Sequence, residues 1–268
     1  MAELPSNPTL TAIIMVGLAT LAVFSTVILL FIRYLQRKKM PALTLVITFL
    51  FWGLGGLSVL IMFILHYLNA PQLAGEVQYA RYGINLGYLF SAISNIFMVL
   101  FVSQIFSQSP LFRRTKSTLP IINGILNGIT IGLIINSISL SLDTTNPDIT
   151  EIYNPQYPIA QTVFHLIMTL TAFILLQGFS IKYSRQASTR WEKVGFNFIN
   201  LYAISGMMIY ILFAVDLIVA ELFTYFAYGY TIFNYLGWAC GILMAVFGYL
   251  GYAMPTGIRN MLKEKEEN

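Results

Sequence analysis

The chain consists of seven long apolar stretches separated by short polar segments. The apolar stretches predict helices at roughly 9–35, 41–68, 78–107, 118–141, 157–183, 194–221 and 226–254. Each exceeds the roughly 20 apolar residues that cross a bilayer as a helix. Prolines lie at or near the ends of these stretches and not near their middles, so unbroken helices are expected. The pattern therefore predicts an all-α membrane protein, a bundle of seven transmembrane helices.

The polar segments between the stretches alternate in charge. Every Lys and Arg except Arg81 flanks the inner side of this series: Arg33, Arg37, Lys38, Lys39, Arg113, Arg114, Lys116, Lys182, Arg185, Arg190, Lys193, Arg259, Lys263 and Lys265. Short loops rich in Lys and Arg stay in the cytoplasm. The alternation therefore predicts an outer amino terminus, an inner carboxyl terminus and a multi-pass location in the plasma membrane.

Composition agrees with a membrane protein. Hydrophobic residues make up 57% of the 268 residues and charged residues only 10%, whereas soluble domains carry about 25% charged residues. The length leaves room for one seven-helix domain over 1–255 and a short charged cytoplasmic tail over 256–268. The net charge of +4 comes from loops that meet anionic headgroups. We therefore expect the lipid bilayer as a partner and no nucleic acid.

Ionisable residues inside the stretches gather toward the predicted outer side. They are His66, Arg81, His165, Asp216 and Glu221. Such residues are costly in lipid and normally face the bundle interior or a hydrated cavity. We expect Asp216 to face inward as part of a pair, with Arg81 as its candidate partner. The competing interpretation is that Arg81 and Glu221 extend to the headgroups. The two histidines lack close spacing and cysteine support, so no metal site is predicted.

Further polar residues extend this outer cluster. Asn85 and Tyr88 share a helix face with Arg81, and Asn234 lies one turn from Trp238. The alternative for these residues is structural, as bonds between helices or as part of an interfacial aromatic belt. The predicted ligand-binding residues are Arg81, Asn85, Tyr88, His165, Asp216, Asn234 and Trp238.

Glycines at four-residue spacing mark the fourth stretch. Gly124, Gly128 and Gly132 would let a second helix approach closely. We expect this stripe to pack within the bundle, with a homodimer face as the alternative. Gly55 and its neighbours in the second stretch carry the same expectation of close packing.

Several chemistries lack the residues that they need. All lysines lie in the basic segments or at their edges, so no lysine is placed to form a Schiff base with retinal inside the bundle. The chain contains no HExxH sequence and no P-loop. We therefore predict neither an enzyme nor a bound cofactor.

The last apolar stretch resembles the final helix of prokaryotic seven-transmembrane sensor input regions. These regions close with a Tyr-x-Gly sequence, a proline and a basic stretch, and the matching residues are Gly237, Trp238, Tyr249, Gly251, Pro255 and Arg259. The topology is rhodopsin-like without the retinal lysine. The resemblance implies ligand sensing, and because such regions normally continue into a kinase or cyclase, it implies a separate cytoplasmic signalling partner here.

The sequence thus favours a receptor-like sensor that binds a small ligand in an outward-facing polar pocket. A small-solute transporter or channel is the alternative, in which uncharged polar residues of the inner half would line the path: Asn123, Asn127, Asn197 and Asn200. A membrane assembly or scaffold subunit is the second alternative, with the glycine stripe as its contact face.

Overall fold

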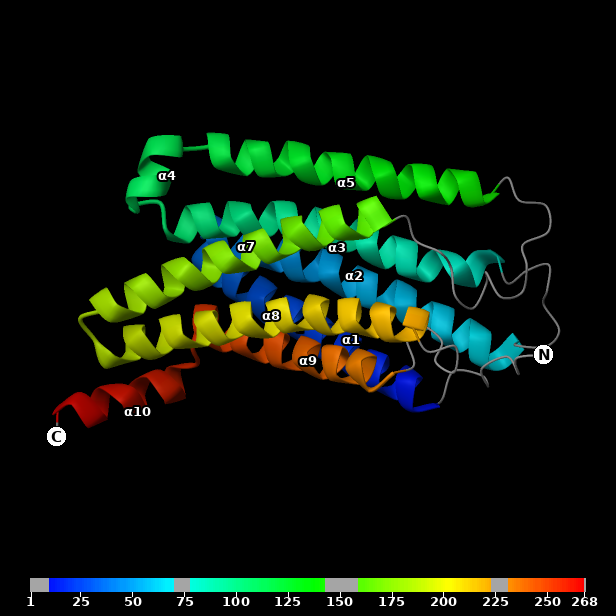
Figure 1. Cartoon of the computed structure of the whole chain (residues 1–268). Helices are drawn as coiled ribbons and strands as arrows, with labels where there is room; N and C mark the ends of the chain where they lie inside the picture. The colour runs from blue at the N-terminus through cyan, green and yellow to red at the C-terminus, as the bar shows by residue number, and fades with distance from the viewer. Residues whose placement is uncertain (1–9, 70–77, 143–158, 223–230, 268) are drawn as a thin grey trace.

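A computed structural model describes residues 10–69, 78–142, 159–222 and 231–267 of the chain (Figure 1). The helices are α1 (Leu10–Arg37), α2 (Met40–Asn69), α3 (Gln78–Ile105), α4 (Pro110–Thr115), α5 (Thr118–Leu142), α7 (Ile159–Gln186), α8 (Arg190–Leu222), α9 (Ile232–Ala253) and α10 (Thr256–Glu267). All except α4 and α10 are long and apolar enough to cross a membrane, which makes seven spans among the described residues. The same residues contain no strand. The predicted fold class, an all-α bundle of seven transmembrane helices in a multi-pass membrane protein, is confirmed.

Six of the long helices form a closed ring, and the seventh lies outside it. Going round the ring, α1 packs against α2, α2 against α3, α3 against α7, α7 against α8, α8 against α9, and α9 returns to α1. Helix α5 packs on the outside, against α3 and α7, at the top of the bundle in Figure 1. The ring therefore encloses the core, while α5 covers only one side of it.

The basic segments meet at one end of the bundle, on the left in Figure 1. This end carries the α1–α2 turn with Lys38, the short helix α4 with Arg113, the α7–α8 turn with Arg185, and α10 with Arg259. We call it the basic end, and the other the far end. Its cytoplasmic location stays a prediction from the charge pattern.

Two lysines in left-handed backbone conformations end helices at the basic end. Lys38 has φ 53° and Lys116 has φ 47°. The backbone N–H of Lys38 donates to the carbonyl of Tyr34, and that of Lys116 to the carbonyl of Phe112, each at 2.7 Å. These bonds satisfy helix-end carbonyls that have no partner within the helix. The two turns therefore share the same backbone conformation and the same hydrogen bond.

The observed helix bounds differ modestly from the predicted ones. The sixth span begins at Arg190, four residues before the predicted 194, and the predicted starts at 9, 157 and 226 lie outside the described residues. Residues 256–267, within the predicted charged tail, form α10. The guanidinium of Arg259 lies 4.5 Å from the ring centre of Trp191 at the start of α8, a cation–π contact. This contact places α10 against α8.

The half of the ring toward the basic end is packed with aromatic side chains. Phe106, which is only 1% exposed, has its ring centre 5.3 Å from Phe179, 5.0 Å from Tyr183 and 6.1 Å from Phe196. These residues come from α7 and α8, beside the end of α3. Ring pairs at these separations are well packed. The core at this end is therefore closed by side chains.

Glycines of α2 and α5 differ in how closely a neighbouring helix approaches them. A Cβ at Gly55 would lie 3.2 Å from the carbonyl oxygen of Gly87, so α2 and α3 meet closely, as predicted. A Cβ at Gly124 would lie 3.9 Å from Ile96 of α3. Gly128 and Gly132 are exposed, and a Cβ there would meet nothing described within 4 Å. Gly128 and Gly132 therefore make no close helix contact among the described residues, and of the three glycines only Gly124 lies near α3.

Candidate functional site

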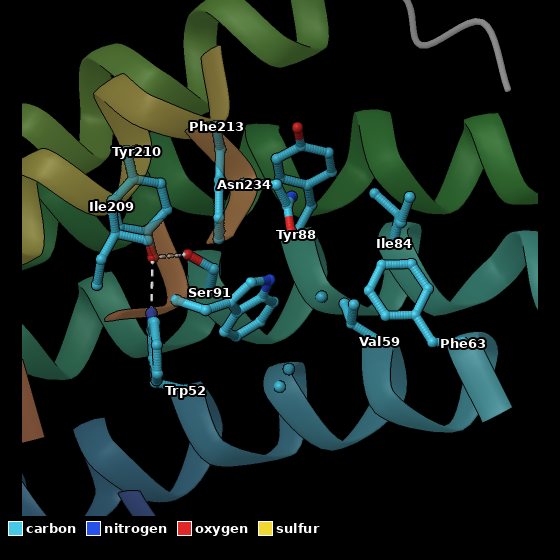
Figure 2. A pocket seen from close by; sticks show the side chains of 14 residues that line it. Trp52, Val59, Phe63, Ile84, Tyr88, Ser91, Ile209, Tyr210, Phe213 and Asn234 are labelled. Carbon is cyan, nitrogen blue, oxygen red and sulfur yellow. Dashed lines mark hydrogen bonds between the residues drawn. The ribbon is translucent and has the colours of Figure 1, made fainter. Parts of the chain in front are cut away.

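A cavity lies inside the ring between α2, α3, α8 and α9, in the half toward the far end (Figure 2). Its volume is about 70 Å³, well above the roughly 10–15 Å³ that one water molecule needs. It is lined by Trp52, Gly55, Gly56, Val59, Phe63, Ile84, Gly87, Tyr88, Ser91, Ile209, Tyr210, Phe213, Asn234 and Trp238. Three of these are glycines, whose missing side chains leave room where helices cross.

The walls of the cavity are largely aromatic. The ring of Trp238 lies 6.1 Å from that of Trp52 and 5.2 Å from that of Phe213, in tilted arrangements. Among the lining residues that the structure describes there is no Asp, Glu, Lys, Arg or His. A charged ligand would lose its hydration here without gaining a counter-charge from the walls. The cavity therefore suits an uncharged molecule with an apolar, preferably planar, body.

A hydrogen-bond network fixes one wall. Trp52 Nε1 donates to the hydroxyl of Tyr210 at 3.1 Å, and that hydroxyl shares a 2.6 Å bond with Ser91 Oγ (Figure 2). The three residues come from α2, α8 and α3. Their polar groups satisfy one another, which buried groups require. The network therefore holds three helices in register beside the cavity.

Asp216 orients the side-chain amide of Asn234, another lining residue. Its side chain is fully buried on α8, where Thr231 Oγ1 donates to Oδ1 at 2.5 Å and Asn234 Nδ2 donates to Oδ2 at 3.4 Å. Thr231 is the N-cap of α9 and accepts from the backbone N–H of Phe233. A carboxylate can accept hydrogen bonds but cannot donate them. The Asn234 amide therefore turns its NH₂ toward Asp216 and its oxygen away.

Two buried polar atoms of the cavity walls have no hydrogen-bond partner among the described residues. They are the Asn234 Oδ1 and the Trp238 Nε1, on side chains that are each 5% exposed. An unsatisfied buried donor or acceptor costs about 1–3 kcal/mol. One wall thus offers a hydrogen-bond acceptor and a donor one helical turn apart. A ligand carrying the complementary pair would satisfy both.

His165 lies behind the lining. Its ring centre is 5.2 Å from that of Tyr88 and 5.9 Å from that of Tyr210, both with edge-to-face geometry, and its side chain is 1% exposed. Neither ring nitrogen has a hydrogen-bond partner among the described residues, and the same holds for the amide of Gln161 one turn away. His165 therefore does not line the cavity but packs against two tyrosines that do.

The predicted ligand-binding residues fall into three groups. Tyr88, Asn234 and Trp238 line the cavity. Asn85, His165 and Asp216 are buried near it without lining it. The side chain of Arg81 lies outside the described residues, as do those of His66 and Glu221, so the expected Arg81–Asp216 pair stays a prediction. Within the described part of the chain, no three His, Cys, Asp or Glu side chains gather as metal ligands.

Sequence reasoning did not single out Trp52 and Tyr210, which form the hydrogen-bonded wall, or Val59 and Phe63. A signal was present for three of them. Trp52, Val59 and Phe63 are seven and four residues apart, the spacing of one helix face. In a helix that is apolar throughout, however, this spacing does not separate a lining face from a packed one.

The cavity is thus a mainly apolar, aromatic space with one unpartnered donor and one unpartnered acceptor. Comparison of the chain with protein families, with curated proteins and with solved structures finds no match. The chemistry of the site is therefore argued from its own geometry.

Proposed function

We propose that the protein is a receptor-like sensor of a prokaryotic plasma membrane that binds a small, uncharged, largely apolar ligand in the cavity. The observation that carries this proposal is a pair of polar atoms on one wall of an aromatic cavity, Asn234 Oδ1 and Trp238 Nε1, that have no partner among the described residues. The described lining of this cavity carries no charged side chain. Ligand pockets are typically apolar with a few placed polar groups that fix orientation. The cavity has this composition.

The position of the cavity suits a signal that changes helix packing. The Trp52–Tyr210–Ser91 network ties three of the surrounding helices together, and the Asp216–Thr231 bond ties α8 to the start of α9. A ligand shifts an equilibrium between two packings only by its differential affinity for them. A ligand between these helices would favour the packing that best closes around it, and α8 and α9 both run to the basic end.

The basic end is the proposed contact for a separate cytoplasmic signalling partner. It presents exposed arginines on α4, and α10 lies beside α8 through the Arg259–Trp191 contact. A change in the tilt of α8 would move α10 with it. The proposed output is therefore a displacement of α10 and the adjoining basic turns.

A transporter or channel is the less favoured alternative. Three of the four asparagines expected to line an inner path bond to other residues: Asn123 donates to the carbonyl of Asn95 at 3.3 Å, Asn127 donates to Asn123 at 3.1 Å, and Asn197 accepts from Ser184 at 2.7 Å. The Asn200 Oδ1 has no hydrogen-bond partner among the described residues. The aromatic packing around Phe106 closes the core near the basic end. These contacts favour sensing over transport.

The experiment is a thermal-shift screen of the purified protein against paired ring compounds, such as uncharged benzamide and charged benzoate. We expect uncharged members to raise the unfolding temperature and their carboxylates to fail. Trp238→Phe keeps an aromatic ring but removes the indole N–H, so it should weaken binding of a responding compound about fivefold, the loss of one hydrogen bond. Trp191→Phe, at the basic end, is the matched control and should leave binding unchanged.

Two results would contradict the proposal. Equal binding of the charged and uncharged members would show that the apolar cavity is not the site, and so would equal affinities of Trp238→Phe and Trp191→Phe. Saturable uptake of a responding compound into liposomes would instead favour the transporter.

A further inference from the structure

A second concave site lies on the outside of the ring, between α3 and α5 at the basic end. It is a groove of about 500 Å³. Its lining residues are Ile96, Leu100, Ser103, Lys116, Ser117, Pro120, Ile121 and Gly124. None of them lines the cavity between α2, α3, α8 and α9. The groove is therefore separate from the candidate ligand site.

The groove is apolar along its length and basic at one end. Ile96, Leu100 and Ile121 supply aliphatic walls, and Ser103 Oγ donates internally to the carbonyl of Leu100 at 2.7 Å. Lys116 lies at the turn that precedes α5, where the chain leaves the basic end. The groove is therefore complementary to a lipid: its apolar walls can contact a hydrocarbon chain, and Lys116 can contact an anionic headgroup.

Local structure holds Lys116 at this mouth. The short helix α4 starts at the N-cap Ser109, whose hydroxyl accepts from the N–H of Phe112 at 3.3 Å. Phe112 is only 3% exposed and packs 5.2 Å from the ring of Phe179 on α7. Helix α4 is therefore anchored to the ring, and its C-cap Lys116 is set in the left-handed conformation with its N–H bonded to Phe112. Arg113, also exposed, lies one turn away on α4.

Gly124 keeps the groove open. It lies on the α5 face toward α3, and a Cβ there would approach Ile96 at 3.9 Å. A larger side chain at this position would extend into the groove. Gly128, one turn further along the same helix, has open space around it and does not line the groove. The two glycines are therefore a matched pair for testing the groove alone.

We propose that this groove binds one acyl chain of an anionic phospholipid, with the phosphate of its headgroup at Lys116. Helix α5 lies on the outside of a membrane-spanning bundle, so the surrounding bilayer supplies hydrocarbon chains to its apolar surface. Lysines near the headgroup level attract anionic lipids, at about 1 kcal/mol each. A zwitterionic lipid offers the same acyl chains without the net charge, so the anionic lipid is preferred. The proposal does not depend on the proposed sensor function.

The test is native mass spectrometry of the delipidated full chain, titrated with dioleoyl phosphatidylglycerol or dioleoyl phosphatidylcholine. We expect the wild type to retain phosphatidylglycerol preferentially. Lys116→Gln should lower phosphatidylglycerol affinity about fivefold, the equivalent of one lysine–lipid attraction, and leave phosphatidylcholine unchanged. Lys38→Gln is the control, because Lys38 shares the residue type, the left-handed conformation and the basic end but not the groove.

The shape of the groove is tested by a second pair of variants. Gly124→Leu should abolish the retained adduct of both lipids, whereas Gly128→Leu should keep it. If Gly124→Leu does not fold, Lys116→Glu and Lys38→Glu replace it, because both positions are exposed. Lys116→Glu should then weaken phosphatidylglycerol binding more than Lys38→Glu does. Equal effects of the Lys116 and Lys38 variants would overturn the proposal, since the attraction would then be spread over the whole basic end. Retention of lipid by folded Gly124→Leu would also overturn the proposal. So would a wild type that forms a dimer without lipid when Gly124→Leu is a monomer, because the groove would then be a contact between two copies of the chain.

Discussion

The bond between Asp216 and Thr231 provides the sharpest test of the structure near the cavity. Asp216 Oδ1 accepts from the Thr231 hydroxyl at 2.5 Å, and Oδ2 accepts from the Asn234 amide at 3.4 Å. The first distance lies in the range of charge-assisted O–H···O⁻ bonds, 2.5–2.7 Å, whereas the second is long for any hydrogen bond. Most of the coupling between α8 and α9 at this level should therefore reside in the threonine bond.

The expected magnitude follows from the membrane setting. Hydrogen bonds between membrane helices average about 0.6 kcal/mol in double-mutant cycles and reach about 1.7 kcal/mol. A short, fully buried bond belongs near the top of that range, so we expect a coupling energy of about 1.5 kcal/mol between Asp216 and Thr231. The Asn234 bond should contribute about 0.5 kcal/mol or less, because of its length.

Asp216→Leu alone does not isolate this energy. The substitution also relieves the cost of burying a carboxylate and removes any other interaction of Asp216, and these effects oppose one another. Thr231→Val alone removes the N-cap of α9 as well, at about 1 kcal/mol. A double-mutant cycle of Asp216→Leu and Thr231→Val cancels these separate costs and leaves the pair term.

The assay is equilibrium unfolding of the four proteins in mixed micelles with increasing fractions of SDS, followed by far-ultraviolet circular dichroism. The expected result is that the double variant is more stable than the sum of the single changes predicts, by about 1.5 kcal/mol. A coupling energy below about 0.3 kcal/mol, within the usual error of additivity, would refute the inference that this bond ties α8 to α9.

Two further predictions concern packing and use the same assay. Phe106→Ala should destabilise the protein by about 3 kcal/mol, because the ring fills the closed core at the basic end. Phe31→Ala is the control: its side chain is 43% exposed, so the change should cost under about 0.5 kcal/mol. Similar costs for the two variants would contradict a closed core. Gly83→Ala should destabilise by about 1–3 kcal/mol, since its Cβ would lie 2.5 Å from that of Met62. Gly132→Ala, with nothing described within 4 Å, should be neutral or stabilising by up to about 1 kcal/mol; destabilisation there would place an unseen neighbour against α5.

The location of polar residues on helix faces was predictable, but their contacts were not. Periodicity placed Tyr88 with Asn85, and Asn234 with Trp238, and all four are at least partly buried. It did not show that Tyr88 lines a cavity while Asn85 does not, because that difference depends on which neighbour covers each turn. Nor did it show that Asp216 would meet Thr231, since that contact depends on how α8 and α9 pack.

Sequence alone determined the class of the protein. Lipid offers no hydrogen bonds to unpaired N–H and C=O groups, so only helices and closed barrels span it. Seven continuous apolar stretches of helix-spanning length, about 20 residues or more, select helices. Charge on the connecting segments predicts the orientation for an equally simple reason, the preference of basic loops for the cytoplasm. Both inferences rest on properties of single segments.

Tertiary structure alone decided which faces became site, core or outer surface. Gly124 and Gly128 are alike in sequence, yet Gly124 lines a groove beside α3, whereas a Cβ at Gly128 would meet nothing described within 4 Å. Trp52 and Tyr210 are 158 residues apart and meet only because α2 and α8 flank the same cavity. In a membrane, apolar residues suit both lipid and core, so hydrophobicity does not select the packing partners, and the fit between side chains does.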